Sequence, residues 1–218
     1  MSRIKMLWLL TISLLFSLPV QAQLVVLQYH HVSAGTPPVT SVTPAQFEQH
    51  LQLIEQLQLP VVDLVSALQQ LDNGQTLPDG AVAISFDDAY LSIYQHALPA
   101  LEKRRWPFVV FVDTGAVEPQ TQGVISWQQL RDLKRRGATL ANHSVDHPYL
   151  IERPSNSSLT QWLEQQITQA QQRLEQETGA TPKLFAYPYG EFDVAITKWL
   201  QQQGYKSFGQ QSGPIGRF

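Results

Sequence analysis

The 218-residue sequence contains no cysteine. A thiolate can therefore serve neither as a nucleophile nor as a metal ligand, and no disulfide stabilises the fold, whatever compartment the protein occupies. The sequence also lacks an excess of basic residues, because 15 Lys and Arg against 18 Asp and Glu give a formal net charge of −3. Nucleic-acid-binding domains carry clustered positive charge, so we expect no nucleic-acid partner.

Long hydrophobic runs are absent after the N-terminus. Arg3 and Lys5 precede the apolar stretch Met6–Val20, and Val20-Gln21-Ala22 has the small residues of a cleavage site. The apolar stretch is shorter than the roughly 20 residues of a membrane-spanning helix. Residues 1–22 are therefore predicted to be a cleaved signal peptide of an exported protein, periplasmic or secreted; an uncleaved anchor is the alternative.

No linker rich in Pro, Gly or Ser and no internal repeat divides residues 23–218, which we interpret as one domain. Short apolar runs, typical of buried strands, alternate there with amphipathic helical segments. This alternation predicts an α/β fold with a parallel sheet, open or closed into a barrel. Such folds bind their ligands at the carboxyl ends of the strands. The expected strands are Leu24–Tyr29, Ala81–Phe86, Phe108–Val112, Ala138–Ala141, Leu184–Tyr187 and Tyr205–Gly209.

Two adjacent carboxylates, Asp87 and Asp88, directly follow the expected strand Ala81–Phe86. Neighbouring carboxylates repel each other, so holding both at a strand end requires a cation or a proton. The alternative is a pair of acidic residues that caps the helix expected from Leu91.

His143 and His147 follow the expected strand Ala138–Ala141, and their spacing allows both rings to reach one ion. On its own, such a pair is more often a coincidence. One carboxylate and two imidazoles form a facial metal triad with open positions, which leaves the second carboxylate free as a base. Together the four residues predict a metal-assisted hydrolase. An iron oxygenase with the same triad is disfavoured, because it needs no second carboxylate.

Two further segments lie at strand ends. Tyr187-Pro188-Tyr189-Gly190 can form a turn that directs a backbone N–H into the site, although an ordinary turn with packed aromatic rings explains this motif better when it is taken alone. His30 and His31 end the first strand, where an imidazole can protonate a leaving amine. The alternative for these histidines is a structural role at the rim.

Phe86-Asp87-Asp88, His143-Ser144-Val145-Asp146-His147-Pro148 and Tyr187-Pro188-Tyr189-Gly190 resemble, in this order, three motifs of the polysaccharide deacetylase family, the NodB-like carbohydrate esterases of family four. The resemblance implies a distorted (β/α) barrel of about seven strands. It assigns Asp87 as the general base and the Tyr189 backbone as the oxyanion donor. It also implies a divalent metal held by Asp88, His143 and His147, with zinc expected first and cobalt, nickel or iron(II) as alternatives.

The family usually takes its catalytic acid from a histidine near the C-terminus, and here no histidine follows His147. Tyr29-His30 is similar to an N-terminal motif of the branch that acts on poly-β-1,6-N-acetylglucosamine, so the resemblance makes His30 the acid. The third motif lacks its usual arginine, and relatives continue beyond Phe218, so the expected barrel can be incompletely closed. The implied function is a metal-dependent N-deacetylase of N-acetylglucosamine residues in an extracytoplasmic polysaccharide. A binding module that keeps the fold without turnover is the alternative, and nothing in the sequence predicts an oligomeric state.

Overall fold

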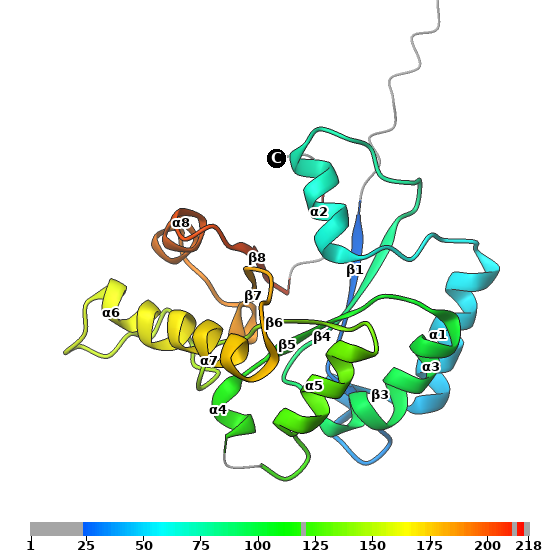
Figure 1. Cartoon of the computed structure of the whole chain (residues 1–218), viewed down its shortest axis with the longest axis horizontal. Coiled ribbons are helices and arrows are strands. Elements are labelled where there is room, and N and C mark those ends of the chain that lie inside the picture. Colours follow the sequence, from blue (N-terminus) through cyan, green and yellow to red (C-terminus); the bar gives the residue numbers. More distant parts are fainter. Residues whose placement is uncertain (1–23, 119–120, 211–212, 216–218) are drawn as a thin grey trace, which may run out of the picture.

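The structure is a computed structural model that describes residues 24–118, 121–210 and 213–215. A six-stranded sheet with the order β1-β4-β5-β6-β7-β8 forms its centre, and all neighbouring strands in it are parallel (Figure 1). Its strands are β1 (Val25–Tyr29), β4 (Val82–Phe86), β5 (Val109–Val112), β6 (Thr139–Asn142), β7 (Leu184–Ala186) and β8 (Lys206–Phe208). A separate parallel pair consists of β2 (His31–Val32) and β3 (Ser41–Val42). The predicted α/β fold with a parallel sheet is therefore confirmed.

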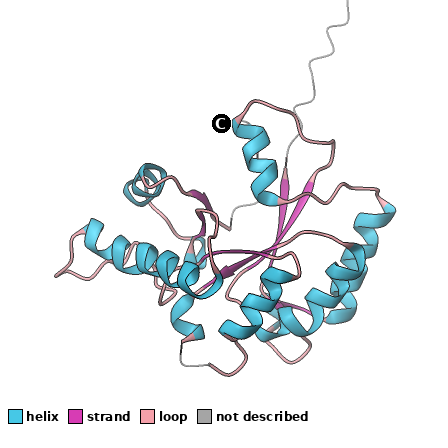
Figure 2. Cartoon of the chain, in the orientation of Figure 1, coloured by secondary structure: helices cyan, strands magenta, loops and turns pink. Residues whose placement is uncertain are grey.

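Helices connect successive strands of the large sheet (Figure 2). They are α1 (Pro44–Gln56), α2 (Leu64–Asp72), α3 (Leu98–Arg104), α4 (Thr114–Val117), α5 (Trp127–Arg135), α6 (Leu159–Leu163), α7 (Gln169–Thr178) and α8 (Val194–Gln202). A π-helical turn, Ile93–Ala97, leads into α3, and another, Glu164–Thr168, joins α6 to α7. Helices α1, α5 and α6 begin with capping boxes, in which Thr43, Ser126 and Ser158 each accept a backbone N–H and the side chain of a glutamine accepts the N–H of the capping residue.

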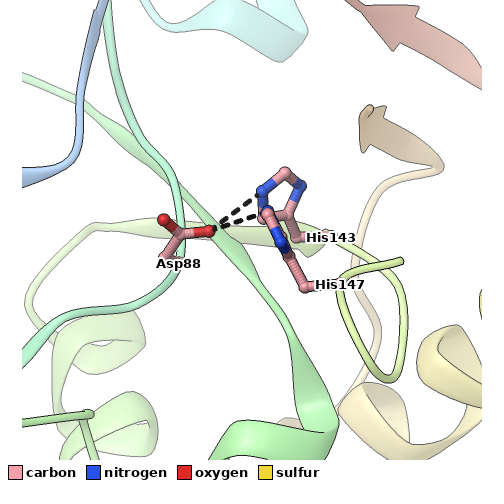
Figure 3. A group of neighbouring side chains, drawn as sticks. All are labelled: Asp88, His143 and His147. Atoms are coloured by element: carbon pink, nitrogen blue, oxygen red, sulfur yellow. Dashed lines mark ion pairs between the residues drawn. The ribbon is translucent and has the colours of Figure 1, made fainter. Parts of the chain in front are cut away.

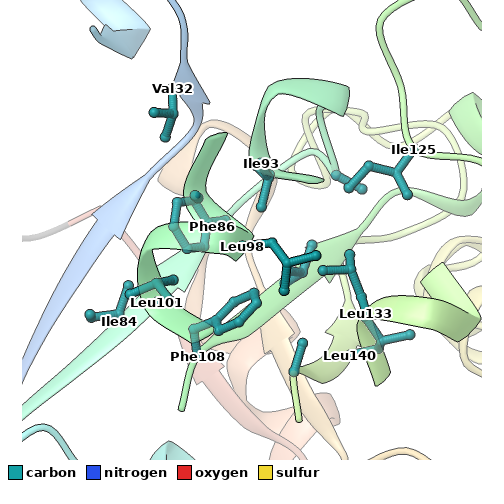
Figure 4. Close-up of a cluster of buried hydrophobic side chains, with 14 of the residues drawn as sticks. Val32, Ile84, Phe86, Ile93, Leu98, Leu101, Phe108, Ile125, Leu133 and Leu140 are labelled. Carbon is teal, nitrogen blue, oxygen red and sulfur yellow. The ribbon is translucent and has the colours of Figure 1, made fainter. Parts of the chain in front are cut away.

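Side chains of the strands alternate between two apolar layers. The outer layer lies between the sheet and helices α1, α3 and α5, and Figure 4 shows part of it around Phe86 and Leu98. The inner layer gathers residues from all six strands and from α2, which is possible only inside the curl of the sheet. Its strand residues include Val26, Ala83, Phe111, Ala141, Ala186 and Phe208. Every second residue of a strand therefore faces the interior.

The sheet forms an open half-barrel. Within the described residues, β1 and β8 each pair with one strand of the sheet, and an isolated antiparallel bridge links Leu24, just before β1, to Ile215, which follows β8. Its two backbone hydrogen bonds are 3.1 and 2.8 Å long. The described residues thus form six of the roughly seven expected strands. As expected, the barrel is not completely closed. The predicted signal peptide lies outside the described residues, and no described helix is long and apolar enough to cross a membrane.

Candidate metal centre and active site

Three loops at the carboxyl ends of β4, β6 and β7 carry the three sequence motifs. Asp88, His147 and Tyr189 have φ angles of 67°, 49° and 57°, so each motif contains at least one residue with a left-handed backbone. This conformation is unfavourable for residues with a Cβ, and it persists where surrounding contacts enforce it. Strain of this kind concentrates at functional sites, and here it marks the same three loops as the sequence motifs.

Asp88, His143 and His147 converge as the sequence predicts. The Oδ1 atom of Asp88 lies 3.2 Å from the Nε2 atom of each histidine (Figure 3). One ligand atom from each residue lies within 4.8 Å of the others, a grouping that can hold a metal ion. Asp88 Oδ1 is buried and makes no hydrogen bond, so a cation would satisfy it. The residues present therefore fit a divalent metal.

A hydrogen bond to β7 fixes the orientation of the His143 ring. Its Nδ1 atom lies 2.9 Å from the carbonyl oxygen of Ala186 on β7, which can only accept a hydrogen bond. Nδ1 therefore carries the proton, and Nε2 is left to face Asp88. Metal-binding histidines commonly have such an outer partner, because it fixes the ring and its tautomer.

Without a metal, Asp88, His143 and His147 strongly shift one another's pKa values. Burial alone would lower the pKa of His143, but the contact with Asp88 and the charge of Asp87 raise it to about 9. Burial would likewise raise the pKa of Asp88, but the two histidines lower it to about 2. Burial and the charge of His143 lower the pKa of His147 to about 4. A proton on His143 thus supplies the positive charge that a metal would otherwise provide.

Asp87 lies beside this group and is 1% exposed. Its Oδ2 atom accepts a 2.5 Å hydrogen bond from the side chain of Gln28 on β1, whereas its Oδ1 atom is buried without a partner. Burial raises the pKa of Asp87, against the opposing effect of the charges of His143 and His30. One oxygen is therefore held and the other is free to accept a proton. No role was predicted for Gln28 from the sequence.

His30 and His31 both lie near the carboxylates but differ in surroundings. His30 directly follows β1 and comes two residues after Gln28, which reaches Asp87. The charge of His30 lowers the pKa of Asp87 and also acts on Asp88. The His31 ring instead stacks on Tyr90 with centroids 3.5 Å apart, and burial lowers its pKa. The assignment of His30 as the acid stays a prediction, and the effect of its charge on both carboxylates supports it.

Asp113 directly follows β5 and belongs to none of the three sequence motifs. It is 8% exposed and its Oδ1 atom has no hydrogen-bond partner. The register of Val112 with Asn142 places Asp113 beside His143. Burial raises the pKa of Asp113 to about 7, while the charges of His143 and Asp88 act in opposite directions. The signal was present, because Asp113 follows an apolar strand just as Asp87 does.

Tyr189 lies in the turn that follows β7, close to the metal-ligand group. Its ring meets the His147 ring edge to face, with centroids 4.5 Å apart. The neighbouring Tyr187 is buried and donates a hydrogen bond to Ser207 on β8, so it is a packing residue. The role of the Tyr189 backbone as an oxyanion donor stays a prediction.

A cavity of about 780 Å³ lies along β8 and α8, away from this site. Phe192, Phe208 and Ile215 are among its lining residues, and the three predicted metal ligands are not. The three sequence motifs therefore meet outside this cavity.

Comparison with known proteins agrees with the motifs and the fold. The family model of polysaccharide deacetylase matches residues 74–208. A poly-beta-1,6-N-acetyl-D-glucosamine N-deacetylase of Escherichia coli K12 is 23% identical over 84% of this chain and 33% of its own length. The enzyme of that name from Staphylococcus aureus MRSA252 is 25% identical over 76% of this chain and 59% of its own length.

The chain thus spans less than two thirds of these curated relatives. Among solved structures, IcaB from Ammonifex degensii superimposes with a TM-score of 0.79 and 27% identity, over 90% of this chain and 87% of that one. The family model covers more than half of the chain and contains the loops of all three motifs, so the chain belongs to the polysaccharide deacetylase family.

Proposed function

We propose that this protein is a metal-dependent N-deacetylase that hydrolyses the acetamide groups of N-acetylglucosamine residues in an extracytoplasmic polysaccharide. The observation that carries the proposal is the convergence of Asp88, His143 and His147 beside Asp87, whose Oδ1 atom is buried and unpartnered. The names of the relatives support the substrate class. Export rests on the pattern of residues 1–22 in the sequence.

The remaining residues have distinct roles in the proposed reaction. A divalent ion held by Asp88, His143 and His147, zinc first, would polarise the acetyl carbonyl and lower the pKa of a water from about 15.7 toward 7. Asp87 accepts a proton from the attacking water at its free Oδ1 atom. The new C–O bond forms at the carbonyl carbon, and the backbone N–H of Tyr189 donates to the resulting oxyanion. His30 then protonates the nitrogen as the C–N bond breaks, which releases acetate and a free amine.

The test measures acetate released from poly-N-acetylglucosamine, chitin oligomers and peptidoglycan, by protein that is first chelated and then reloaded with metal. We expect release only after reloading. Asp88→Ala should lose both metal and turnover, whereas Asp87→Asn should keep the metal and lose turnover, because it removes a base and not a ligand. Asp79→Asn is the matched control, since Asp79 is exposed and not part of the site.

Two results would contradict the proposal. Loss of metal from Asp87→Asn would show that the roles of the two aspartates are exchanged. Metal binding without acetate release from any polymer would favour a glycan- or partner-binding module that retains the fold.

A further inference from the structure

Two tyrosine rings stack on each other at the rim of the proposed active site. The centroids of Tyr149 and Tyr189 are 3.9 Å apart and the ring planes differ by 11°. Tyr189 also contacts the ring of the metal-ligand residue His147. The pair therefore begins at the metal-ligand group and extends away from it, with Tyr149 as the outer ring.

These rings are not part of the protein's apolar interior. Tyr149 is 42% exposed and Tyr189 is 47% exposed, and neither belongs to a buried hydrophobic cluster of the described chain. Among the described residues, neither hydroxyl has a hydrogen-bond partner. Exposed aromatic surface beside a reactive group is typical of a ligand-binding surface.

The face of an aromatic ring favours one kind of ligand, the C–H-rich face of a sugar ring. Its π-system is electron-rich, so it attracts C–H groups, which carry a small positive charge. A pyranose ring presents several C–H groups on one face and hydroxyls at its edge. An exposed tyrosine can therefore cover the apolar face of a sugar and leave the sugar hydroxyls in water.

We propose that Tyr149 and Tyr189 form a subsite for the sugar ring next to the one being deacetylated, so that the protein prefers polymers to single sugars. This inference rests on the proposed function. Tyr189 touches a metal-ligand residue, so it lies beside the reacting sugar. Tyr149 is one ring further out and contacts the neighbouring sugar of the same chain.

The test compares metal-loaded wild type, Tyr149→Ala and Tyr149→Trp on N-acetylglucosamine oligomers of five or more sugars and on the shortest acetylated substrate that reacts. Tyr149→Ala should raise KM for the long oligomers about tenfold, the size of effect expected for losing an aromatic stack. Its kcat, its metal affinity and its reaction with the shortest substrate should match wild type. Tyr149→Trp should have a KM close to that of wild type, because tryptophan keeps an aromatic face at this position. Leu57→Ala, which removes an exposed apolar side chain elsewhere, is the control.

The outcomes separate this inference from the proposed function. An unchanged oligomer KM in an active Tyr149→Ala enzyme overturns the subsite and leaves the function intact. Equal losses with short and long substrates, or a loss of metal, would mean that Tyr149 only supports His147, which also overturns it. If wild type deacetylates nothing, the proposed function fails. Calorimetric titration with the long oligomer then decides the subsite, because Tyr149→Ala should still weaken binding about tenfold.

Discussion

Gly115 lies in the first turn of α4. We predict that its backbone positions the loop that contains the predicted metal ligand His147. A Cβ at this position would lie 2.5 Å from the backbone oxygen of Val145 and 3.1 Å from Asp146 Oδ1. The Gly115 N–H donates a 2.8 Å hydrogen bond to that same oxygen of Val145. The loop that ends at His147 therefore rests directly on the α4 backbone.

Two opposing effects determine the result of Gly115→Ala. Alanine favours a helix over glycine by about 1 kcal/mol. Forcing an extra methyl group into a packed space costs about 1–3 kcal/mol, and here the obstacle is a main-chain atom that cannot rotate away. We expect the clash to win, with a net loss of up to about 2 kcal/mol of stability. For a domain of this size that lowers Tm by about 2–4 °C per kcal/mol.

The same shift should affect the metal. Val145 lies two residues before His147, so moving its backbone displaces the ligand ring. Outer-shell changes of this kind cost about 10- to 100-fold in metal affinity. Calorimetry of unfolding and of metal binding measures both effects. Gly35→Ala is the control, because a Cβ there meets only Ser33 Oγ at 3.9 Å. If Gly115→Ala melts and binds metal like wild type, this contact does not hold the loop.

Three further predictions concern the site. Because the pKa of His143 is about 9 in the metal-free protein and a ligand must be neutral, metal affinity should rise about tenfold per pH unit up to pH 9. Titration at pH 7 in buffers of different ionisation enthalpy should then show about one proton released, and no release would contradict this pKa. His30→Ala should lower the deacetylation rate about 100- to 10,000-fold at unchanged metal affinity, and His31→Ala much less. The reverse order would move the acid by one residue. Gln28→Met, which frees the Oδ2 atom of Asp87, should lower kcat about 10- to 100-fold without loss of metal. An unchanged kcat would show that the base needs no such support.

Much of the fold followed from local patterns. The strand Ala81–Phe86 was predictable because six consecutive apolar or small residues precede the two aspartates. The start of α1 was predictable because Thr43 and Gln46 have the spacing of a capping box. Such features depend on residues a few positions apart, and the same is true of the predicted metal ligands His143 and His147.

Other features depend on pairings that no local pattern contains. Gln28 reaches Asp87 only because β1 lies parallel to β4 in a register that sets Gln28 opposite Ser85. Asp113 is a candidate only because β5 and β6 bring it beside His143. The open edge between β1 and β8 depends likewise on which strands pair. Local sequence indicates which residues end a strand, but the register decides which of them meet.

A metal ion at the predicted site would offset two unfavourable contributions to the stability of the same three loops. Asp87 and Asp88 are adjacent, buried carboxylates, and in the metal-free protein the charge that opposes them comes from a proton on His143. Asp88, Ala89, Ser144, His147 and Tyr189 also hold left-handed backbones, each costing about 1–2 kcal/mol. An ion bound only by the folded loops stabilises them by mass action, about 4 kcal/mol at a thousand times its Kd. That stabilisation opposes the strain of the loops, so we infer that metal binding and the strained loop geometry stabilise each other.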